Sequence, residues 1–187
     1  TVLLHLVGGA RLVLPLNVSL IVSGVRGHIP VTGVADEGGG VVREMLTSAG
    51  VGIESIVEVS TSTPVKTRVL AGAVGTTKQQ VLRLDDEPTP LDAVISRQVA
   101  DTLRDKASDA AAIVISDYGL GSVGDEVVEV ASELARAGHI VCVDSRYGLE
   151  RFGAVTAVTP NQPEAEAVLG FRIDSNEDIE RAGARLR

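Results

Sequence analysis

The chain has 187 residues, a length that suits one domain with a sizeable core, and its formal net charge is −8 at pH 7. Only 2% of the residues are aromatic, so the composition does not supply the basic, base-stacking surface that binds nucleic acid. Cys142 is the single cysteine, which excludes an internal disulfide framework or a metal cluster built on cysteines and favours a buried, inert thiol. These features predict a cytoplasmic protein that has no nucleic-acid partner.

The first 85 residues predict mainly strands. The apolar segment over residues 1–22 is interrupted by glycines, Arg11 and Pro15, and no basic region precedes it, so two strands and a turn are expected there rather than a membrane span or a signal peptide. Because the chain begins at Thr1 and its only methionine is Met45, we expect a truncated or processed chain. The patterns that follow predict a short helix over 16–24, a strand over 28–34, a helix over 39–49, and strands over 53–59, 65–72 and 79–85.

From Leu91 onward, helical and strand patterns alternate. The predicted elements are a helix over 92–107, a strand over 111–116, a helix over 123–137, strands over 140–144 and 154–159, a helix that begins at Asn161, and a last helix capped by Ser175. Strands that alternate with amphipathic helices predict a parallel α/β sheet with right-handed crossovers.

Polar residues follow the strands of this second half. The strand over 111–116 runs into Asp117, the next strand ends on Asp144, and the third leads to Asn161. Parallel strands end at one edge of their sheet, where open α/β sheets bind their ligands. The three side chains are therefore predicted to converge on one crevice.

Asn161 and Glu164 lie three residues apart at the start of a helix, and this spacing allows two interpretations. Asn-x-x-Glu can form a capping box, in which each side chain accepts a hydrogen bond from a free backbone N–H of the first turn. The pair can also belong to a ligand site. A cap accounts for Asn161, but it does not explain why Asp117 and Asp144 converge on the same crevice.

Residues 119–124 read G-x-G-x-x-G, and Asp144 lies twenty residues after Gly124 at the end of the next strand. This is the spacing of the dinucleotide-binding fingerprint. However, Asp117 and Tyr118 separate the strand from the first glycine, and Asp117 would direct a negative charge toward the pyrophosphate. An NAD-type dinucleotide-binding α/β domain stays open as an alternative.

Seven motifs occur in an informative order along the chain. They are NVSLIVSG, DEGG, TPVKTRVLAG, QQVLRLDDE, VISDYGLG, VDSRYG and TPNQPEAEAVLG. From about residue 17 to residue 170 the chain resembles the ribokinase-like (PfkB) carbohydrate kinases, in particular the heptose 7-phosphate kinase module of bifunctional ADP-heptose synthesis enzymes. The resemblance implies a three-layer α/β/α fold with a mostly parallel sheet and a small β lid, incomplete at both ends. It also implies transfer of the ATP γ-phosphoryl group to a sugar phosphate, with ATP and Mg²⁺ as cofactors.

The resemblance further implies roles for individual residues. The residues expected to contact the sugar phosphate are Asn17, Lys66, Gln80, Arg83 and Asp117. Those expected to contact the nucleotide and its phosphates are Asp144, Arg146, Asn161 and Glu164. Glu164 is also expected to hold Mg²⁺ indirectly, through water.

The catalytic base of the family lies in a Gly-Ala-Gly-Asp motif that residues 1–187 do not contain, and Leu120 stands where the relatives have a lysine. We therefore expect a single, partial kinase domain over residues 1–187 that has no catalytic residue and is inactive by itself. Lid strands are expected within about 1–16 and 64–85, where a second copy of the chain can dock, and no membrane partner is expected. A non-catalytic remnant or binding module is a further alternative.

Overall fold

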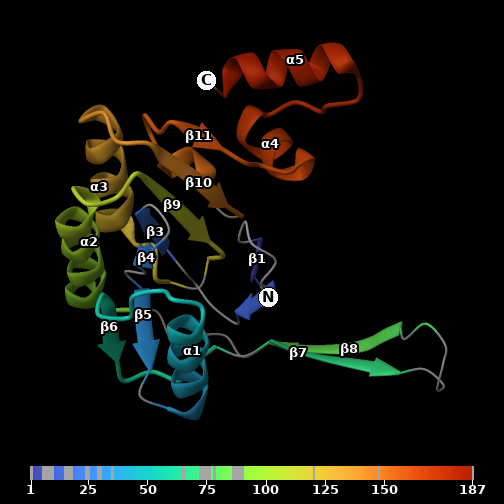
Figure 1. The fold of residues 1–187 in the computed structure, drawn as a ribbon. Coiled ribbons are helices and arrows are strands. Elements are labelled where there is room, and N and C mark those ends of the chain that lie inside the picture. The colour runs from blue at the N-terminus through green and yellow to red at the C-terminus, as the bar shows by residue number, and fades with distance from the viewer. Residues whose placement is uncertain are drawn as a thin grey trace.

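The computed structural model describes residues 2–5, 11–14, 19–23, 26–28, 31–34, 36–64, 66–71, 77, 79–85, 91–119, 121–146 and 148–186. Its largest sheet has five strands in the order β11-β10-β9-β3-β4 (Figure 1). These strands are β3 (Ser19–Ser23), β4 (Arg26–His28), β9 (Ala112–Asp117), β10 (Val141–Ser145) and β11 (Ala157–Val158). Strands β9, β10 and β11 are parallel, as predicted, whereas β3 runs antiparallel to both β9 and β4.

One face of the sheet forms the core of the molecule. In β10, and in β9 as far as Ile115, every second side chain is buried, and Ile113 and Ile115 lie in register with Val141 and Val143. Two helices, α2 (Ala93–Ala107) and α3 (Asp125–Arg136), pack side by side against this face (Figure 1). The period-2 burial of the strands and the apolar stripes of the helices therefore match the pattern that the sequence predicts.

Helices α2 and α3 approach each other closely at Gly124, the residue before α3. A Cβ atom at this position would lie 2.0 Å from the Ser96 Oγ atom, so a larger residue would force the two helices apart. The Ser96 hydroxyl donates a hydrogen bond of 2.7 Å to Glu126, and this bond is the main reason why the pKa of Glu126 is lowered. The contact joins the first turns of the two helices.

Three predictions about secondary structure need correction. Residues 19–23 form a strand and not part of a short helix, because the run Ser19–Ser23 pairs with the buried strand β9 and its β-branched residues suit a sheet. The strand expected over 154–159 is only Ala157–Val158, and the helix expected from residue 123 begins at Asp125. Cys142, expected to be buried, is only partly buried because it lies on the sheet face opposite the main core.

The first half of the chain forms smaller units. Strands β1 (Val2–His5) and β2 (Arg11–Leu14) pair antiparallel, in agreement with the predicted two strands, and β5 (Val31–Val34) pairs in parallel with β6 (Ile56–Val59). Helix α1 (Glu37–Ser48) lies beside β5, and its N-cap is Asp36. No helix of the described residues is long and apolar enough to cross a membrane.

A two-stranded hairpin projects from the rest of the molecule at the right of Figure 1. It consists of β7 (Lys66–Ala71) and β8 (Gln79–Asp85), which pair antiparallel in a sheet of their own. Three of its apolar side chains are strongly exposed, namely Val81, Leu82 and Leu84 at 62%, 49% and 55%. An isolated hairpin is only marginally stable in water, so these side chains indicate a surface that another group covers.

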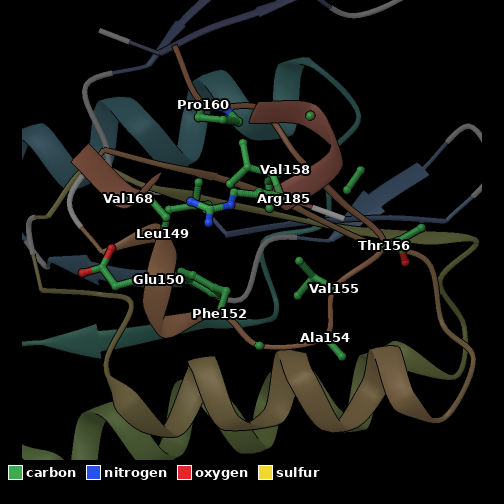
Figure 2. A pocket seen from close by; sticks show the side chains of 14 residues that line it. Leu149, Glu150, Phe152, Ala154, Val155, Thr156, Val158, Pro160, Val168 and Arg185 are labelled. Carbon is green, nitrogen blue, oxygen red and sulfur yellow. The ribbon is translucent and has the colours of Figure 1, made fainter. Parts of the chain in front are cut away.

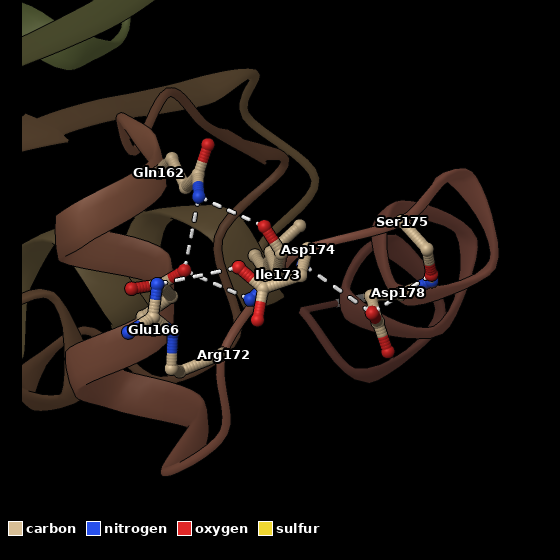
Figure 3. A network of polar contacts seen from close by, with 7 residues as sticks. All are labelled: Gln162, Glu166, Arg172, Ile173, Asp174, Ser175 and Asp178. Carbon is tan, nitrogen blue, oxygen red and sulfur yellow. Dashed lines mark hydrogen bonds and ion pairs between the residues drawn. The ribbon is translucent and has the colours of Figure 1, made fainter.

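The last two helices are joined by a polar network (Figure 3). In α4 (Gln162–Leu169), the Gln162 side chain donates to Glu166 and to the backbone oxygen of Ile173, at 3.0 and 2.8 Å. Glu166 also accepts the backbone N–H of Ile173 at 2.8 Å, which is the largest cause of its lowered pKa. Helix α5 (Asn176–Arg185) then begins at its predicted cap, Ser175. The network fixes the connection through which α5 follows α4.

Candidate active site

The carboxyl ends of the three parallel strands meet at one edge of the sheet. Asp117 ends β9 and lies in register with Ser145 of β10, whereas Asp144 pairs with Ser116. Beyond β11, the Thr159 hydroxyl donates a hydrogen bond of 3.2 Å to Asp144, and Asn161 begins α4 two residues later. The edge predicted from the polar strand ends is therefore present, and Asp117, Asp144 and Asn161 all lie along it.

Asp117 faces the protein interior and is only 4% exposed. One of its carboxylate oxygens accepts the backbone N–H of Gly119 at 2.9 Å, and the other accepts the Ser145 hydroxyl at 3.1 Å. A buried carboxylate is costly unless it is paired and hydrogen-bonded, and both conditions are met here by groups of the protein. These contacts order the loop after β9 and the end of β10.

Asn161 and Glu164 form the capping box that their spacing predicts. The Asn161 side-chain oxygen accepts the backbone N–H of Glu164 at 3.0 Å, and Glu164 accepts the backbone N–H of Asn161 at 2.8 Å. A third bond of 2.7 Å runs from the Asn161 amide nitrogen to the other Glu164 oxygen. Asn161 therefore holds both oxygens of the Glu164 carboxylate, which is more than a cap requires.

A cavity of about 450 Å³ lies beside this pair. Its lining includes Arg146 just after β10, Glu164 in the first turn of α4, and Gly148 between them. The Arg146 guanidinium lies 5.2 Å from the centre of the Tyr118 ring, and the Arg146 backbone N–H donates to the backbone oxygen of Asp117 at 3.1 Å. Two of the residues predicted to contact the nucleotide, Arg146 and Glu164, thus face one cavity and carry opposite charges.

A second cavity, of about 650 Å³, lies on the other side of the short 3₁₀ helix η1 (Leu149–Arg151), between β11 and α5 (Figure 2). Its walls combine apolar side chains, Leu149, Phe152 and Val158 among them, with polar groups, and the Arg185 side chain enters it from α5. No motif in the sequence predicts this cavity, because its walls come from three separate segments, 149–160, 168 and 183–186.

The described residues contain no group of three or more His, Cys, Asp or Glu side chains that could hold a metal ion. Glu164 still has lone pairs free, because a carboxylate accepts about four hydrogen bonds and Asn161 occupies two, one from its backbone N–H and one from its amide nitrogen. Such a carboxylate fits a hydrated Mg²⁺, which keeps several waters and needs only one or two carboxylates. The residues therefore fit indirect binding of Mg²⁺ and do not form a closed protein cage.

Two of the lid residues predicted to contact the sugar phosphate, Gln80 and Arg83, share one face of the hairpin. The register pairs Arg68 with Arg83 but Leu70 with Gln80, so Val81 is an extra residue in a bulge. The bulge shifts the alternation of β8 by one residue and places Gln80 on the face of Arg83. Lys66 is paired with Asp85 in the register, and the Arg83 guanidinium donates to Asp85 at 2.7 Å. Asn17, the fifth residue of that set, lies outside the described residues, as does Leu120.

Curated relatives support the resemblance. Two of them are the bifunctional protein HldE of Helicobacter hepaticus, 32% identical over 176 residues, and that of Pelobacter propionicus, 34% identical over 151 residues. The matches cover 92% and 79% of this chain but 34% and 30% of the relatives, so the chain spans about a third of their length. No protein-family model matches the chain.

Solved structures have the same fold. Phosphofructokinase-2 from Escherichia coli, in complex with substrates and products, matches with a TM-score of 0.62 and 18% identity over 83% of this chain and 50% of its own. For 2-dehydro-3-deoxygluconokinase from Thermotoga maritima the TM-score is 0.58 and the identity 16%, over 85% of this chain and 53% of its own. The chain therefore has a ribokinase-like fold and is a relative of HldE over about a third of that protein's length.

In this ribokinase-like relative of HldE, the residues that follow the glycine loop do not favour the binding of a dinucleotide. Asp125 and Glu126 occupy the first turn of α3, directly after Gly124. Carboxylates at a helix N-terminus already complement its positive dipole end and repel a pyrophosphate. The comparisons, too, are with sugar kinases, so the NAD-type alternative is not favoured.

Two residues at the edge of this ribokinase-like fold were not anticipated from the sequence. Tyr118 lies against Arg146, and Arg151 of η1 reaches Asp117 and Asp125 across the strand ends. An arginine in a loop does not by itself indicate which residues it will contact, so the sequence does not single out Arg151. The backbone enters η1 at Gly148, which has a positive φ of 118°.

Proposed function

We propose that this ribokinase-like chain provides the strand-edge part of a kinase site that transfers the γ-phosphoryl group of ATP to a sugar phosphate, of the heptose 7-phosphate type. The observation that carries the proposal is that Arg146 and Glu164 line one cavity at the carboxyl edge of the parallel sheet, along which Asp144 and Asn161 also lie, in a relative of HldE. Arg146 supplies a positive charge, and Glu164 is held in place by Asn161.

The charge at this edge supports a need for a metal ion. Asp117, Asp144 and Glu164 all lie near the strand ends, where they would repel the phosphates of ATP. Mg²⁺ neutralises charge that develops on the phosphates when it is bound. Glu164 would hold it through water, and Arg146 would bind a phosphate oxygen as a charged donor. Gln80 and Arg83, on one face of the lid, would contact the sugar phosphate with Lys66.

We further propose that residues 1–187 alone bind these ligands without turning them over. Phosphoryl transfer requires an aligned acceptor hydroxyl, a base within hydrogen-bond reach and donors for the charge on the γ-phosphate. The Gly-Ala-Gly-Asp segment that would supply the base by resemblance does not occur in residues 1–187. The cytoplasmic location expected from the sequence stays a prediction, as does the identity of the sugar.

A second copy of the chain is the partner that we propose for the hairpin. Val69 and Leu82 are paired in the register and point to the face opposite Arg83, and Leu84 shares that face. All three are more than 40% exposed. Two such faces would bury each other in a homodimer and leave the polar face, with Gln80 and Arg83, free for a ligand.

Calorimetric titration of the 187-residue chain with ATP in the presence of Mg²⁺, and separately with NAD, tests the proposed site. We expect saturable binding of ATP that depends on Mg²⁺ and weakens in Arg146→Met, and no comparable binding of NAD. Arg172→Met is the matched control, because Arg172 is 80% exposed and is not among the residues that line the cavity. Saturable NAD binding that Asp144→Ala abolishes, with no response to ATP, would contradict the proposal.

A further inference from the structure

Arg151 has contacts that neither the cap nor the ligand residues explain. Its NH2 nitrogen donates to Asp125 at 2.8 Å and to the backbone oxygen of Val123 at 3.3 Å, and its NH1 nitrogen lies 4.0 Å from Asp117. Asp117 lies two residues before the glycine loop (residues 119–124), whereas Val123 and Asp125 flank its last residue. One guanidinium therefore contacts both ends of the loop between β9 and α3.

We call these contacts of Arg151 with Asp117, Val123 and Asp125 the clamp, and they include the buried carboxylate of Asp117. At 4% exposure this group requires a positive partner, and Arg151 is the guanidinium that approaches it. The two hydrogen bonds to Asp117, from Gly119 and Ser145, fix the beginning of the loop and the end of β10. A planar guanidinium suits this position, because its donors lie on separate nitrogens, so NH1 can face Asp117 while NH2 binds Asp125, whereas the donors of a lysine share one nitrogen.

The backbone at Gly148 provides the room that Arg151 needs. Gly148 has a left-handed conformation, and a Cβ atom there would lie 2.8 Å from the Arg151 Cδ atom. Any other residue would push the arginine side chain away from the loop. The absence of a side chain at Gly148 thus allows Arg151 to reach the loop. Both residues come shortly after Arg146 and the end of β10 in the sequence.

We propose that Arg151 is a positioning residue, which couples the glycine loop (residues 119–124) to the loop that carries Arg146 so that both keep one geometry around the ligand. This inference rests on the proposed function of the edge. Arg146 donates its backbone N–H to the backbone oxygen of Asp117 and stacks on Tyr118, so its position depends on where the end of β9 is held. Arg151 acts through the Asp117 carboxylate and the loop.

Amide hydrogen exchange without nucleotide, followed by titration with ATP and Mg²⁺, tests the inference. We expect Arg151→Met to speed exchange of the Gly119 and Arg146 amides about tenfold while the buried amides of α2 keep their rates. We expect it also to weaken ATP binding about tenfold, whereas Arg151→Lys, which keeps one charge contact, falls between Arg151→Met and the native chain. Arg172→Met is the control in both measurements and should match the native chain.

Two results would overturn the proposal that Arg151 is a positioning residue. One is unchanged exchange of the Gly119 and Arg146 amides in Arg151→Met, and the other is faster exchange with unchanged affinity for ATP. Should Arg151→Met not fold, the exchange rates and affinity of Arg151→Lys decide in the same way. Failure of the native chain to bind ATP would refute the proposed function instead, and exchange measured without nucleotide would still decide whether the clamp exists.

Discussion

Asn161 takes part in three hydrogen bonds with Glu164, and only two of them belong to a helix cap. The third, from the amide nitrogen to a Glu164 oxygen, holds the carboxylate that faces the smaller cavity. A capping box and a ligand site are therefore compatible at the same pair of residues. The two roles can be separated, because serine caps a helix about as well as asparagine but has no amide nitrogen to donate.

Asn161→Ser is expected to keep the stability of the protein and to impair the site. The free energy of unfolding should change by less than about 0.5 kcal/mol, whereas Asn161→Ala should lose about 1 kcal/mol with the cap. Affinity for ATP with Mg²⁺ should fall in both variants, since both lose the bond to Glu164. Denaturant unfolding and calorimetry measure the two effects. Full ATP affinity in Asn161→Ser would show that the pair acts as a cap alone.

Asp36 joins two distant segments and should make stability depend on pH. It accepts the Thr63 hydroxyl at 2.6 Å, the Thr63 N–H at 2.8 Å and the Gly39 N–H at 2.7 Å. The hydroxyl bond is the largest cause of the lowered pKa of Asp36. Because the pKa is lower in the folded state, the stabilisation is complete above the unfolded-state value of about 4 and disappears as pH falls through the folded-state value.

Asp36→Asn should therefore be less stable than the native chain at pH 7, and the difference should shrink steadily below about pH 4. Unfolding by urea at a series of pH values measures it. Asp105→Asn, an exposed change of the same kind in α2, serves as the control and should show no such convergence. A constant difference between Asp36→Asn and the native chain from pH 7 to pH 2 would contradict this account.

At the scale of elements, the hairpin illustrates why register matters more than spacing. Gln80 and Arg83 are three residues apart, so regular alternation would place them on opposite faces of β8. The bulge at Val81 shifts the register by one residue and brings them onto one face. The residues at positions 80–82 do not predict this bulge, because it depends on how β8 pairs with β7. The amphipathic character of the hairpin follows from the paired strands and not from either strand alone.

The apolar face of the hairpin predicts a change in oligomeric state. Leu82→Lys together with Leu84→Lys should convert a homodimer into a monomer, because four charges would face each other across the interface. Analytical ultracentrifugation measures the mass of both proteins. The control is Val94→Lys, which places a lysine at a 64% exposed position of α2, and it should remain dimeric. A monomeric native chain would refute the dimer outright.

Prediction from sequence succeeded for the strongly periodic second half of the chain. The apolar stripe of α3, the alternation in β10 and the Ser175 cap are local signals, and each led to the observed element. It failed at residues 19–23, where a short apolar run fits either a helix or a strand and only pairing with β9 decides. The edge itself was predictable because parallel strands must end together.

At the scale of the whole molecule, the contacts across the edge were not predictable. Arg151 reaches Asp117 and Asp125 over more than 25 positions of sequence, and the cavity of Figure 2 combines η1, β11, α4 and α5. Such contacts depend on how the elements pack after each has formed. The fold and its ligand edge are thus encoded locally, whereas the positions of the charged side chains at that edge are set by tertiary packing.

The most direct test of the proposed kinase site is phosphoryl transfer from ATP to heptose 7-phosphate with Mg²⁺. Three proteins are compared: residues 1–187 alone, the chain fused after Arg187 to the segment that contains Gly-Ala-Gly-Asp in an HldE relative, and the fusion with Glu164→Gln. We predict no turnover by residues 1–187, measurable turnover by the fusion, and a loss of at least about tenfold on Glu164→Gln. Turnover by residues 1–187 that is lost on removal of Mg²⁺, or a folded fusion whose turnover is unaffected by Glu164→Gln, would contradict the account.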